Sequence, residues 1–338
     1  MKHIFILNPA AGKGRATGFF LPKIIETSKR MGIDYEIHRT IGPDDARHYV
    51  KKRCEAAAAG LKPEAALRFY ACGGDGTFNE VVNGAFGYKN VETAMIPAGT
   101  GNDFPRNFGI IKPFEDIERQ ILGTARPVDV IRYEYMPANP VSMSQSLSNR
   151  LDAIFESDPD PVVRYGVNMF NIGFDCNVVA KTAEFKAHPF VPGLLAYGLG
   201  VAVILAKKEG VKLDICFDDG EVHSGEILLV AIGNGAWCGG GFKGVPKASL
   251  EDGLMDVSVA RNVSRRTFLS LLGKYRKGTH LEDPAAEKIV TYKKCKRVSI
   301  HPHGAVKLCA DGEIATVAEA IFEIIPGGIK FSVPQGCE

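Results

Sequence analysis

The first 130 residues alternate short apolar runs with stretches of helical spacing. The apolar runs are HIFILN (3–8), DYEIHRT (34–40), LRFYACG (67–73) and TAMIPAG (93–99). The helical patterns between and after them cover residues 18–32, 44–60, 78–86 and 113–122. Strands that alternate with helices form a largely parallel sheet with helices on both faces. This part of the chain is therefore expected to be an α/β domain.

The rest of the chain has a different pattern, with short strands and little helix. Residues 211–235 (VKLDICFDDGEVHSGEILLVAIGNG) contain two strand patterns joined by an Asp-Gly turn, a strong hairpin signal. Separate short strands are expected in LMDVSVARN, KRVSIHP, VKLCAD, FEIIP and IKFSV, and one helix in SRRTFLSLLGKYRKG (264–278). We expect a mostly antiparallel β domain that begins near residue 130. The polar, proline-containing residues 136–163 are expected to form a surface loop extension.

The composition excludes some functions. The chain has 41 Lys and Arg against 39 Asp and Glu, and a net charge of +2 is too small to indicate nucleic acid as a partner. Eight scattered cysteines without a CxxC pair favour reduced thiols in a cytoplasm over a disulfide framework. A zinc site at His301 and His303 lacks further ligands at useful spacing.

The most apolar stretch, GLLAYGLGVAVILA (193–206), is too short to cross a bilayer. It has three glycines and falls below the roughly 20 residues that a spanning helix needs. We favour a buried helix there and leave open a surface that touches lipid. The apolar run in MKHIFILNP is also shorter than that of a signal peptide. We therefore expect a cytoplasmic protein.

Three glycine-rich loops follow strands of the first domain: NPAAGKG (8–14), GGDGT (73–77) and PAGTGND (97–103). Ligands of such sheets bind beyond the carboxyl ends of the strands, so the three loops are expected to share one crevice. The first loop matches neither a Walker A sequence nor G-x-G-x-x-G, because Thr17 stands at the third glycine. Backbone N–H groups at a helix start nevertheless suit a phosphate.

Two aspartates in these loops, Asp75 and Asp103, would face that phosphate. Unpaired carboxylates beside a triphosphate would be strongly unfavourable. Mg²⁺ resolves the conflict, because it binds carboxylates, water and phosphate oxygens together. The loops therefore predict a nucleotide site that contains magnesium.

The three loops, in this order, resemble the diacylglycerol kinase catalytic domain, in particular the soluble bacterial lipid kinases. The resemblance continues through NIGFD (171–175), GNGAWCGGGFKGVPKASLEDGLMDV (233–257) and DGE (311–313). GGDGT alone is shared with NAD kinases, but the leading NP-x-x-G, PAGTGND and DG-x-x-DV favour lipid kinases.

The family implies a Rossmann-like nucleotide-binding domain and a β-sandwich domain for the lipid. The first would cover residues 1–130 and be completed by about 322–338, where IKFSV packs back on it, and the second would cover 131–321. The residues expected to contact ATP are Asn8, Gly12, Thr40, Gly73, Gly74, Asp75, Gly76, Thr77, Phe78, Asn79, Glu80, Gly99 and Thr100.

The resemblance also implies two magnesium sites. Asp75, Asp103 and Asp129 would form an acidic, water-bridged site at the phosphates. A second, structural Mg²⁺ would be held by the Asp252 carboxylate and the carbonyl oxygens of Ser249 and Leu254. A plain hairpin turn in LEDGL is compatible with the same residues.

Glu313 corresponds to the general base that takes the proton of the lipid hydroxyl, and Asp75 is the second catalytic candidate. Which of the two is the base is left open. Without the family, a solvated glutamate in an Asp-Gly hairpin is the simpler interpretation.

The expected reaction is ATP- and Mg²⁺-dependent phosphorylation of a lipid hydroxyl, most simply diacylglycerol to phosphatidic acid or a related or sphingoid lipid. The alternatives are an NAD kinase activity and a nucleotide-binding protein without turnover. We expect transient contact with a membrane surface, with residues 190–195 as candidates. A homodimer is left open as a possibility.

Overall fold

The computed structural model describes residues 1–59, 66–138, 160–174, 176–177 and 210–337. The expected loop extension, the apolar stretch 193–206 and the candidate membrane contact at 190–195 lie largely or wholly outside these residues. No helix among the described residues is both long and apolar enough to cross a membrane.

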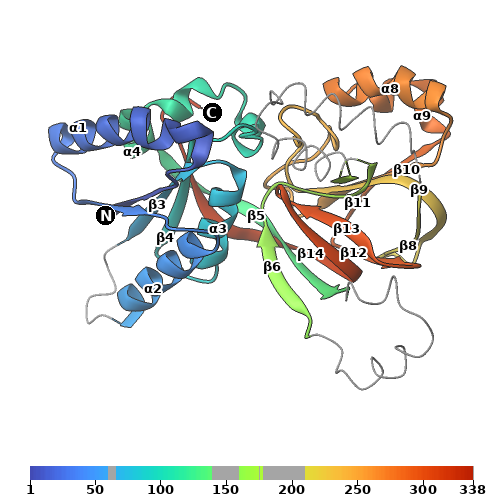
Figure 1. Cartoon of the computed structure of the whole chain (residues 1–338), viewed down its shortest axis with the longest axis horizontal. Coiled ribbons are helices and arrows are strands. Elements are labelled where there is room, and N and C mark those ends of the chain that lie inside the picture. The colour runs from blue at the N-terminus through green and yellow to red at the C-terminus, as the bar shows by residue number, and fades with distance from the viewer. Residues whose placement is uncertain (60–65, 139–159, 175, 178–209, 338) are drawn as a thin grey trace.

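The N-terminal half contains a parallel sheet with helices around it (Figure 1). Its elements are β1 Lys2–Leu7, η1 Ala11–Gly14, η2 Ala16–Phe20, α1 Leu21–Met31, β2 Tyr35–Arg39, α2 Asp45–Ala59, β3 Leu67–Gly73, α3 Asp75–Ala85, β4 Val91–Pro97, η3 Phe104–Phe108, η4 Lys112–Glu115 and α4 Ile117–Ile121. The strands lie in the order β2-β1-β3-β4, and each neighbouring pair is parallel. The helices and strands expected from the sequence are therefore present here.

Alternation of side chains along the strands explains why both faces of this sheet are covered. Ile4 and Ile6 of β1 belong to the apolar cluster that contains residues of α2 and α3. Phe5 and Leu7 point the other way, into a cluster with residues of α1 and α4. A strand with apolar side chains on both faces and a helix layer on each side is the pattern of a buried parallel sheet.

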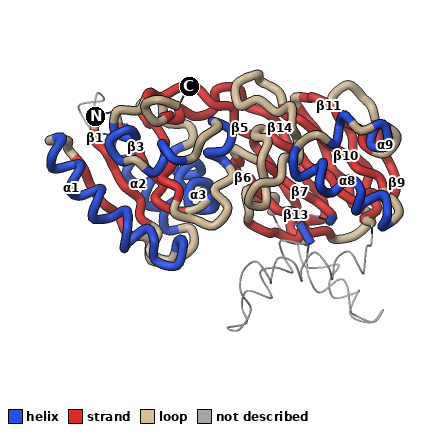
Figure 2. Tube along the Cα trace, turned by 90° about the horizontal axis from the view of Figure 1, so that it is seen from above, coloured by secondary structure: helices blue, strands red, loops and turns tan. Residues whose placement is uncertain are grey.

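The C-terminal half is mainly antiparallel sheet, and its helices α8 and α9 lie on one side of it (Figure 2). Its elements are β5 Thr124–Pro137, β6 Val162–Gly166, β7 Met169–Gly173, β8 Val211–Phe217, β9 Val222–Gly233, β10 Met255–Arg261, α8 Arg265–Lys277, η6 His280–Glu282, α9 Pro284–Glu287, β11 Val290–Cys295, β12 Arg297–Pro302, β13 Val306–Ala310 and β14 Glu313–Val333. The predicted hairpin is confirmed as β8 and β9, which pair antiparallel. The predicted helix is confirmed as α8, whose first turn is capped by the Ser264 side chain.

Six strands of this half pair in a closed circuit. The neighbours are β14-β12, β12-β8, β8-β9, β9-β7, β7-β13 and β13-β14, all antiparallel. The layers of the expected sandwich are thus joined at both edges. Apolar side chains such as Ile172, Ile215 and Phe322 form one cluster with others from these strands.

Strand β14 corrects the sequence prediction, which expected FEIIP and IKFSV as separate strands. The structure has one strand over Glu313–Val333, paired along β5 with a register shift between Ile325 and Ile329. Pro326, Gly327 and Gly328 look like a chain reversal in the sequence, but here they form a bulge. Near its end the strand lies beside the first half, where Phe331 pairs in parallel with Thr93 of β4.

We expect Phe331→Ala to lower the free energy of unfolding by about 3–5 kcal/mol. The Phe331 side chain is fully buried, and its ring lies 5.0–5.4 Å from those of Phe78, Phe104 and Phe108. Its loss would leave a cavity where β14 meets the first half. Chemical denaturation gives the value, with Ile110→Ala, at a 74% exposed side chain, as the control. Equal small effects of both changes would contradict this packing.

Candidate functional site

The three glycine-rich loops meet at the carboxyl ends of β1, β3 and β4. A Cβ atom on Gly99 would lie 2.5 Å from the Cα of Gly74, and one on Gly12 would lie 2.1 Å from the carbonyl oxygen of Ala98. Only glycine allows backbones to approach this closely. The Asn8 side chain also donates to Thr77 Oγ1 over 3.0 Å. The three loops, which were predicted to share one crevice, are therefore in contact with one another.

Asp75 begins α3 and is held against the third loop. Its Oδ1 accepts hydrogen bonds from the backbone N–H groups of Asp103 (2.8 Å) and Phe104 (3.2 Å). Asp103 is buried, accepts from Gly240 N over 2.8 Å and forms an ion pair with Arg106. The two aspartates thus lie together, as the sequence predicted.

Burial and mutual repulsion disfavour charge on these carboxylates. Burial first, and then the charge of Asp103, raises the pKa of Asp75 to about 7. Burial also raises the pKa of Asp103, although Gly240 N–H and Arg106 oppose the change. Asp103 has Arg106 as a charge partner, whereas Asp75 forms no ion pair among the described residues. Two ionised carboxylates with one cation between them are a donor set that fits Mg²⁺. Asp75 and Asp103 are therefore suitable residues to hold the ion.

The environment of Asp129 differs from that of Asp75 and Asp103. Its Oδ2 accepts from Gly253 N and its Oδ1 from Gly327 N, each over 2.7 Å, so it links β5 to the 249–254 turn and to the bulge of β14. Among the described residues, no three His, Cys, Asp or Glu side chains lie close enough together to hold one ion. The metal role of Asp129 stays a prediction, and the contacts here are structural.

Several residues that were predicted to contact the nucleotide make contacts within the protein. Phe78 is buried against Phe104 and Phe331, which leaves its backbone rather than its ring for a ligand. Glu80 accepts from the N–H groups of Asp44 and Ala46 and so caps the start of α2. Thr40 follows β2 and donates its N–H to Leu7 O, whereas Thr100 is exposed in the third loop. None of these contacts tests nucleotide binding.

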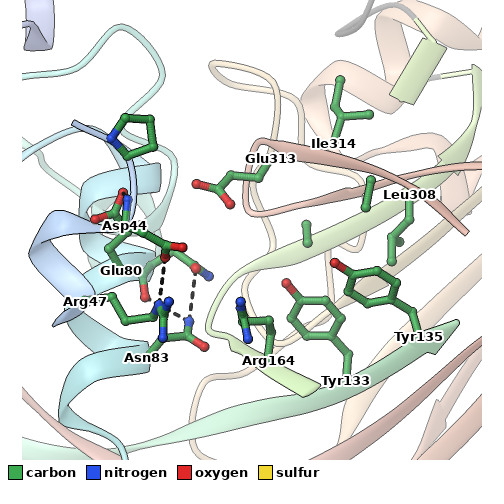
Figure 3. A pocket seen from close by; sticks show the side chains of 14 residues that line it. Asp44, Arg47, Glu80, Asn83, Tyr133, Tyr135, Arg164, Leu308, Glu313 and Ile314 are labelled. Atoms are coloured by element: carbon green, nitrogen blue, oxygen red, sulfur yellow. Dashed lines mark hydrogen bonds and ion pairs between the residues drawn. The ribbon is translucent and has the colours of Figure 1, made fainter. Parts of the chain in front are cut away.

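Glu313 lies next to the second loop. Its Oε1 would be 3.8 Å from a Cβ atom on Gly76. The carboxylate lines a cavity of about 230 Å³, and Figure 3 shows it above Arg164 and Tyr133. Partial burial raises its pKa, as do the charges of Glu80, Asp44 and Asp311, while Arg164 opposes the change. The tertiary structure thus brings Glu313 and the GGDGT loop together.

Asp311 explains how Glu313 is held there, although the sequence analysis assigned no role to this residue. This buried carboxylate accepts from the N–H groups of Val167 (2.9 Å), Asn168 (3.1 Å) and Met169 (2.9 Å) and from Asn79 Nδ2 (3.0 Å). It therefore ties the β13–β14 turn to the β6–β7 turn and to α3. The DGE motif was the available signal, but its aspartate looked like an ordinary turn residue.

The cavity beside Glu313 has polar walls that the sequence did not indicate. Its lining includes Arg47, Asn83, Tyr133, Tyr135, Arg164, Leu308 and Ile314. The Arg47 guanidinium pairs with Asp44 over 2.7 Å, whereas Arg164 donates to Val163 O and forms no ion pair in the described part of the chain. Figure 3 shows Arg164 between Asn83 and Tyr133. These residues come from distant elements, so no local motif could group them.

Comparison with known proteins extends over nearly the whole chain. The Diacylglycerol kinase catalytic domain matches residues 2–133, and the YegS C-terminal NAD kinase beta sandwich-like domain matches residues 168–333. A protein named diacylglycerol kinase from Bacillus subtilis (strain 168) is 29% identical over 317 residues, which is 91% of this chain and 88% of that protein. A diacylglycerol kinase from Staphylococcus carnosus (strain TM300) is 27% identical over 331 residues, 98% of this chain and 94% of that protein.

A solved structure supports the fold. The crystal structure of a diacylglycerol kinase from Bacillus anthracis str. Sterne aligns with a TM-score of 0.65 at 20% identity. The alignment covers 100% of this chain and 98% of that one. At this identity the likeness concerns the fold alone.

We expect Asp75→Asn to stabilise the metal-free protein at high pH. The pKa of the Asp75 carboxyl is near 4 in the unfolded chain and about 7 in the folded protein. The folded protein therefore loses stability as the pH rises from about 4 to about 7. Asparagine can accept the same hydrogen bonds and carries no charge. The variant should therefore match the parent near pH 4 and exceed it by about 1–3 kcal/mol at pH 8.

Thermal unfolding in EDTA from pH 4 to 8 measures this difference. Asp34→Asn, at an exposed carboxylate, is the matched control. Saturating Mg²⁺ should reduce the advantage of Asp75→Asn at pH 8. A difference that stays constant across the pH range would show that Asp75 is not a strained carboxylate.

Proposed function

Because this chain belongs to the diacylglycerol kinase family, we propose that it transfers the terminal phosphoryl group of ATP to a lipid hydroxyl. The proposed acceptor is diacylglycerol or a related lipid with a free hydroxyl. The observation that carries the proposal is the position of Glu313 Oε1 beside Gly76, in the loop that also contains Asp75. An acceptor base and a phosphate-binding loop then share one site.

On the nucleotide side, the chain supplies backbone N–H groups and two carboxylates. The start of α3, which lies within the second loop, suits a phosphate because unpaired N–H groups and the helix dipole both favour negative charge there. Asn8 and Gly12 of the first loop, Gly99 and Thr100 of the third and Thr40 after β2 complete the proposed ATP contacts. Asp75 and Asp103 would hold Mg²⁺, which when bound would offset the charge of the phosphates.

On the acceptor side, Glu313 orients the lipid hydroxyl and takes its proton. The hydroxyl oxygen bonds to the γ-phosphorus as the bond from that phosphorus to the β-phosphate oxygen breaks, and ADP leaves. The raised pKa of Glu313 suits a group that must bind a proton during turnover. Most of the rate enhancement would come from positioning and charge stabilisation rather than from covalent chemistry.

The cavity beside Glu313 is the proposed place for the polar head of the acceptor. Tyr133, Tyr135 and Arg164 offer hydrogen-bond donors there, and Leu308 and Ile314 add apolar contacts. Esters and hydroxyls near the acceptor oxygen are hydrogen-bond acceptors, so these donors suit them. We propose that the protein meets such a lipid transiently at the surface of a cytoplasmic membrane.

The direct test is incubation of the purified protein with γ-labelled ATP, Mg²⁺ and vesicles made from a mixed lipid extract. Label in a lipid, identified by mass spectrometry, is the expected result. Label in NAD under the same conditions would favour an NAD kinase instead. Tight ATP binding without transfer to any lipid or to NAD would indicate a nucleotide-binding protein without turnover.

We expect Glu313→Gln to lower lipid phosphorylation by about 10²–10⁴-fold, the usual worth of general-base help. Nucleotide affinity should change little, because the carboxylate acts on the acceptor. Asp75→Asn should instead weaken binding of the ATP–Mg²⁺ complex and turnover together. Titration calorimetry with a non-hydrolysable ATP analogue and steady-state rates give both quantities. Glu323→Gln, at an exposed carboxylate on the same strand, is the control.

Loss of nucleotide binding in Glu313→Gln, or full turnover by that variant, would contradict the assignment of the base. Asp75 would then become the better candidate.

We expect Arg164→Met to raise the KM for the lipid by about tenfold, roughly the loss of one or two hydrogen bonds. Affinity for the ATP analogue should stay the same, because Arg164 lines the acceptor cavity. Arg132→Met is the matched control, since Arg132 lies on β5 and pairs with Glu134 over 2.7 Å. An unchanged KM for the lipid would remove Arg164 from the acceptor site.

A further inference from the structure

A lysine ammonium from another strand lies beside the turn at 249–254, just before β10. The Nζ atom of Lys294 on β11 lies 2.7 Å from Asp252 Oδ2, 2.8 Å from Asp256 Oδ2 and 3.2 Å from the carbonyl oxygen of Lys247. An ammonium group has three N–H donors, and here each has an oxygen acceptor. This is the turn for which the family resemblance implies a structural Mg²⁺.

The acceptors around the ammonium have little capacity left for an ion. Asp252 Oδ1 accepts from Leu254 N over 3.1 Å, while its other oxygen is paired with Lys294. The Asp256 side chain is fully buried, and its Oδ1 accepts from the Tyr292 hydroxyl over 2.7 Å. Beyond them, Glu251 forms an ion pair with Arg126, and the ammonium of Lys247 lies over the Tyr292 ring.

A divalent ion on the Asp252 carboxylate would lie close to the ammonium and repel it. If the Lys294 side chain moved away, the buried Asp256 would lose its charge partner, and an unpaired buried carboxylate is strongly unfavourable. Mg²⁺ also demands six oxygen ligands, and Oδ2 of Asp252 already accepts from the Lys294 ammonium. The Asp252 carboxylate, paired with Lys294, therefore does not fit the implied ion.

We propose that Lys294 is the resident cation of this turn and replaces the divalent ion. The ammonium joins the turn to β10 and β11 by binding the two aspartates and the Lys247 carbonyl. The turn therefore needs no metal, and removal of the ammonium converts the same oxygen atoms into a divalent-cation site.

Thermal unfolding in EDTA and in millimolar Mg²⁺ tests this proposal without any assay of phosphotransfer. In the parent protein, Mg²⁺ at Asp75 and Asp103 can raise the melting temperature, so each variant is compared by its response to Mg²⁺. Asp252→Asn should show the same response as the parent. Lys294→Met should melt several degrees lower in EDTA and recover more in Mg²⁺ than the parent does, because an ion that binds only the folded state stabilises it.

Two further variants complete the experiment. Adding Asp252→Asn to Lys294→Met should abolish the extra response, and Lys293→Met, whose lysine pairs with Asp219 and Glu221, should respond like the parent. A smaller Mg²⁺ response in Asp252→Asn alone would overturn the proposal, since the turn would then bind an ion beside Lys294. This comparison does not require Lys294→Met to fold.

Discussion

The curvature of β14 is the constraint on which the candidate site depends. Asp311, two residues before this strand, bonds to Asn79 of α3, and Phe331 near its end packs against the neighbouring Phe78. Eighteen residues of straight strand from Glu313 to Phe331 would span about 60 Å, whereas α3 is only about 16 Å long. The strand can reach α3 twice because it bends around the closed circuit of β strands and contains a bulge. Glu313 is thereby brought back to the GGDGT loop.

The carboxylates of Asp75, Asp129, Asp311 and Glu313 divide into two groups by what their oxygens contact. Both oxygens of Asp129 and of Asp311 accept hydrogen bonds from backbone N–H groups, and these residues connect distant segments. Asp75 uses only Oδ1 in this way among the described residues, and Glu313 lines a cavity. The burial that raises the pKa of Asp75 and Glu313 thus falls on groups still available to a ligand. Available carboxylates with perturbed pKa values are typical of functional sites.

Much of this arrangement could be predicted from local pattern. The alternation of strands and helices in the first half, the hairpin of β8 and β9 and the helix α8 all follow from residue periodicity and turn chemistry. The closed circuit of strands and the single long β14 could not be predicted, because Pro326, Gly327 and Gly328 serve a turn and a bulge equally well. Only the partner strand β5 determines which of the two forms.

For the candidate site, the sequence by itself determined that the three loops can meet. Glycines at 12, 74 and 99 allow the loops to touch, and aspartates at 75 and 103 follow strands that end at the same edge of a parallel sheet. Only the tertiary structure decided what lies opposite them. Glu313, Asp311 and Arg164 come from segments far along the chain, and Lys294 lies on a strand that pairs with Asp256. Such contacts depend on strand register, and register is set by the packing of the whole sheet rather than by neighbouring residues.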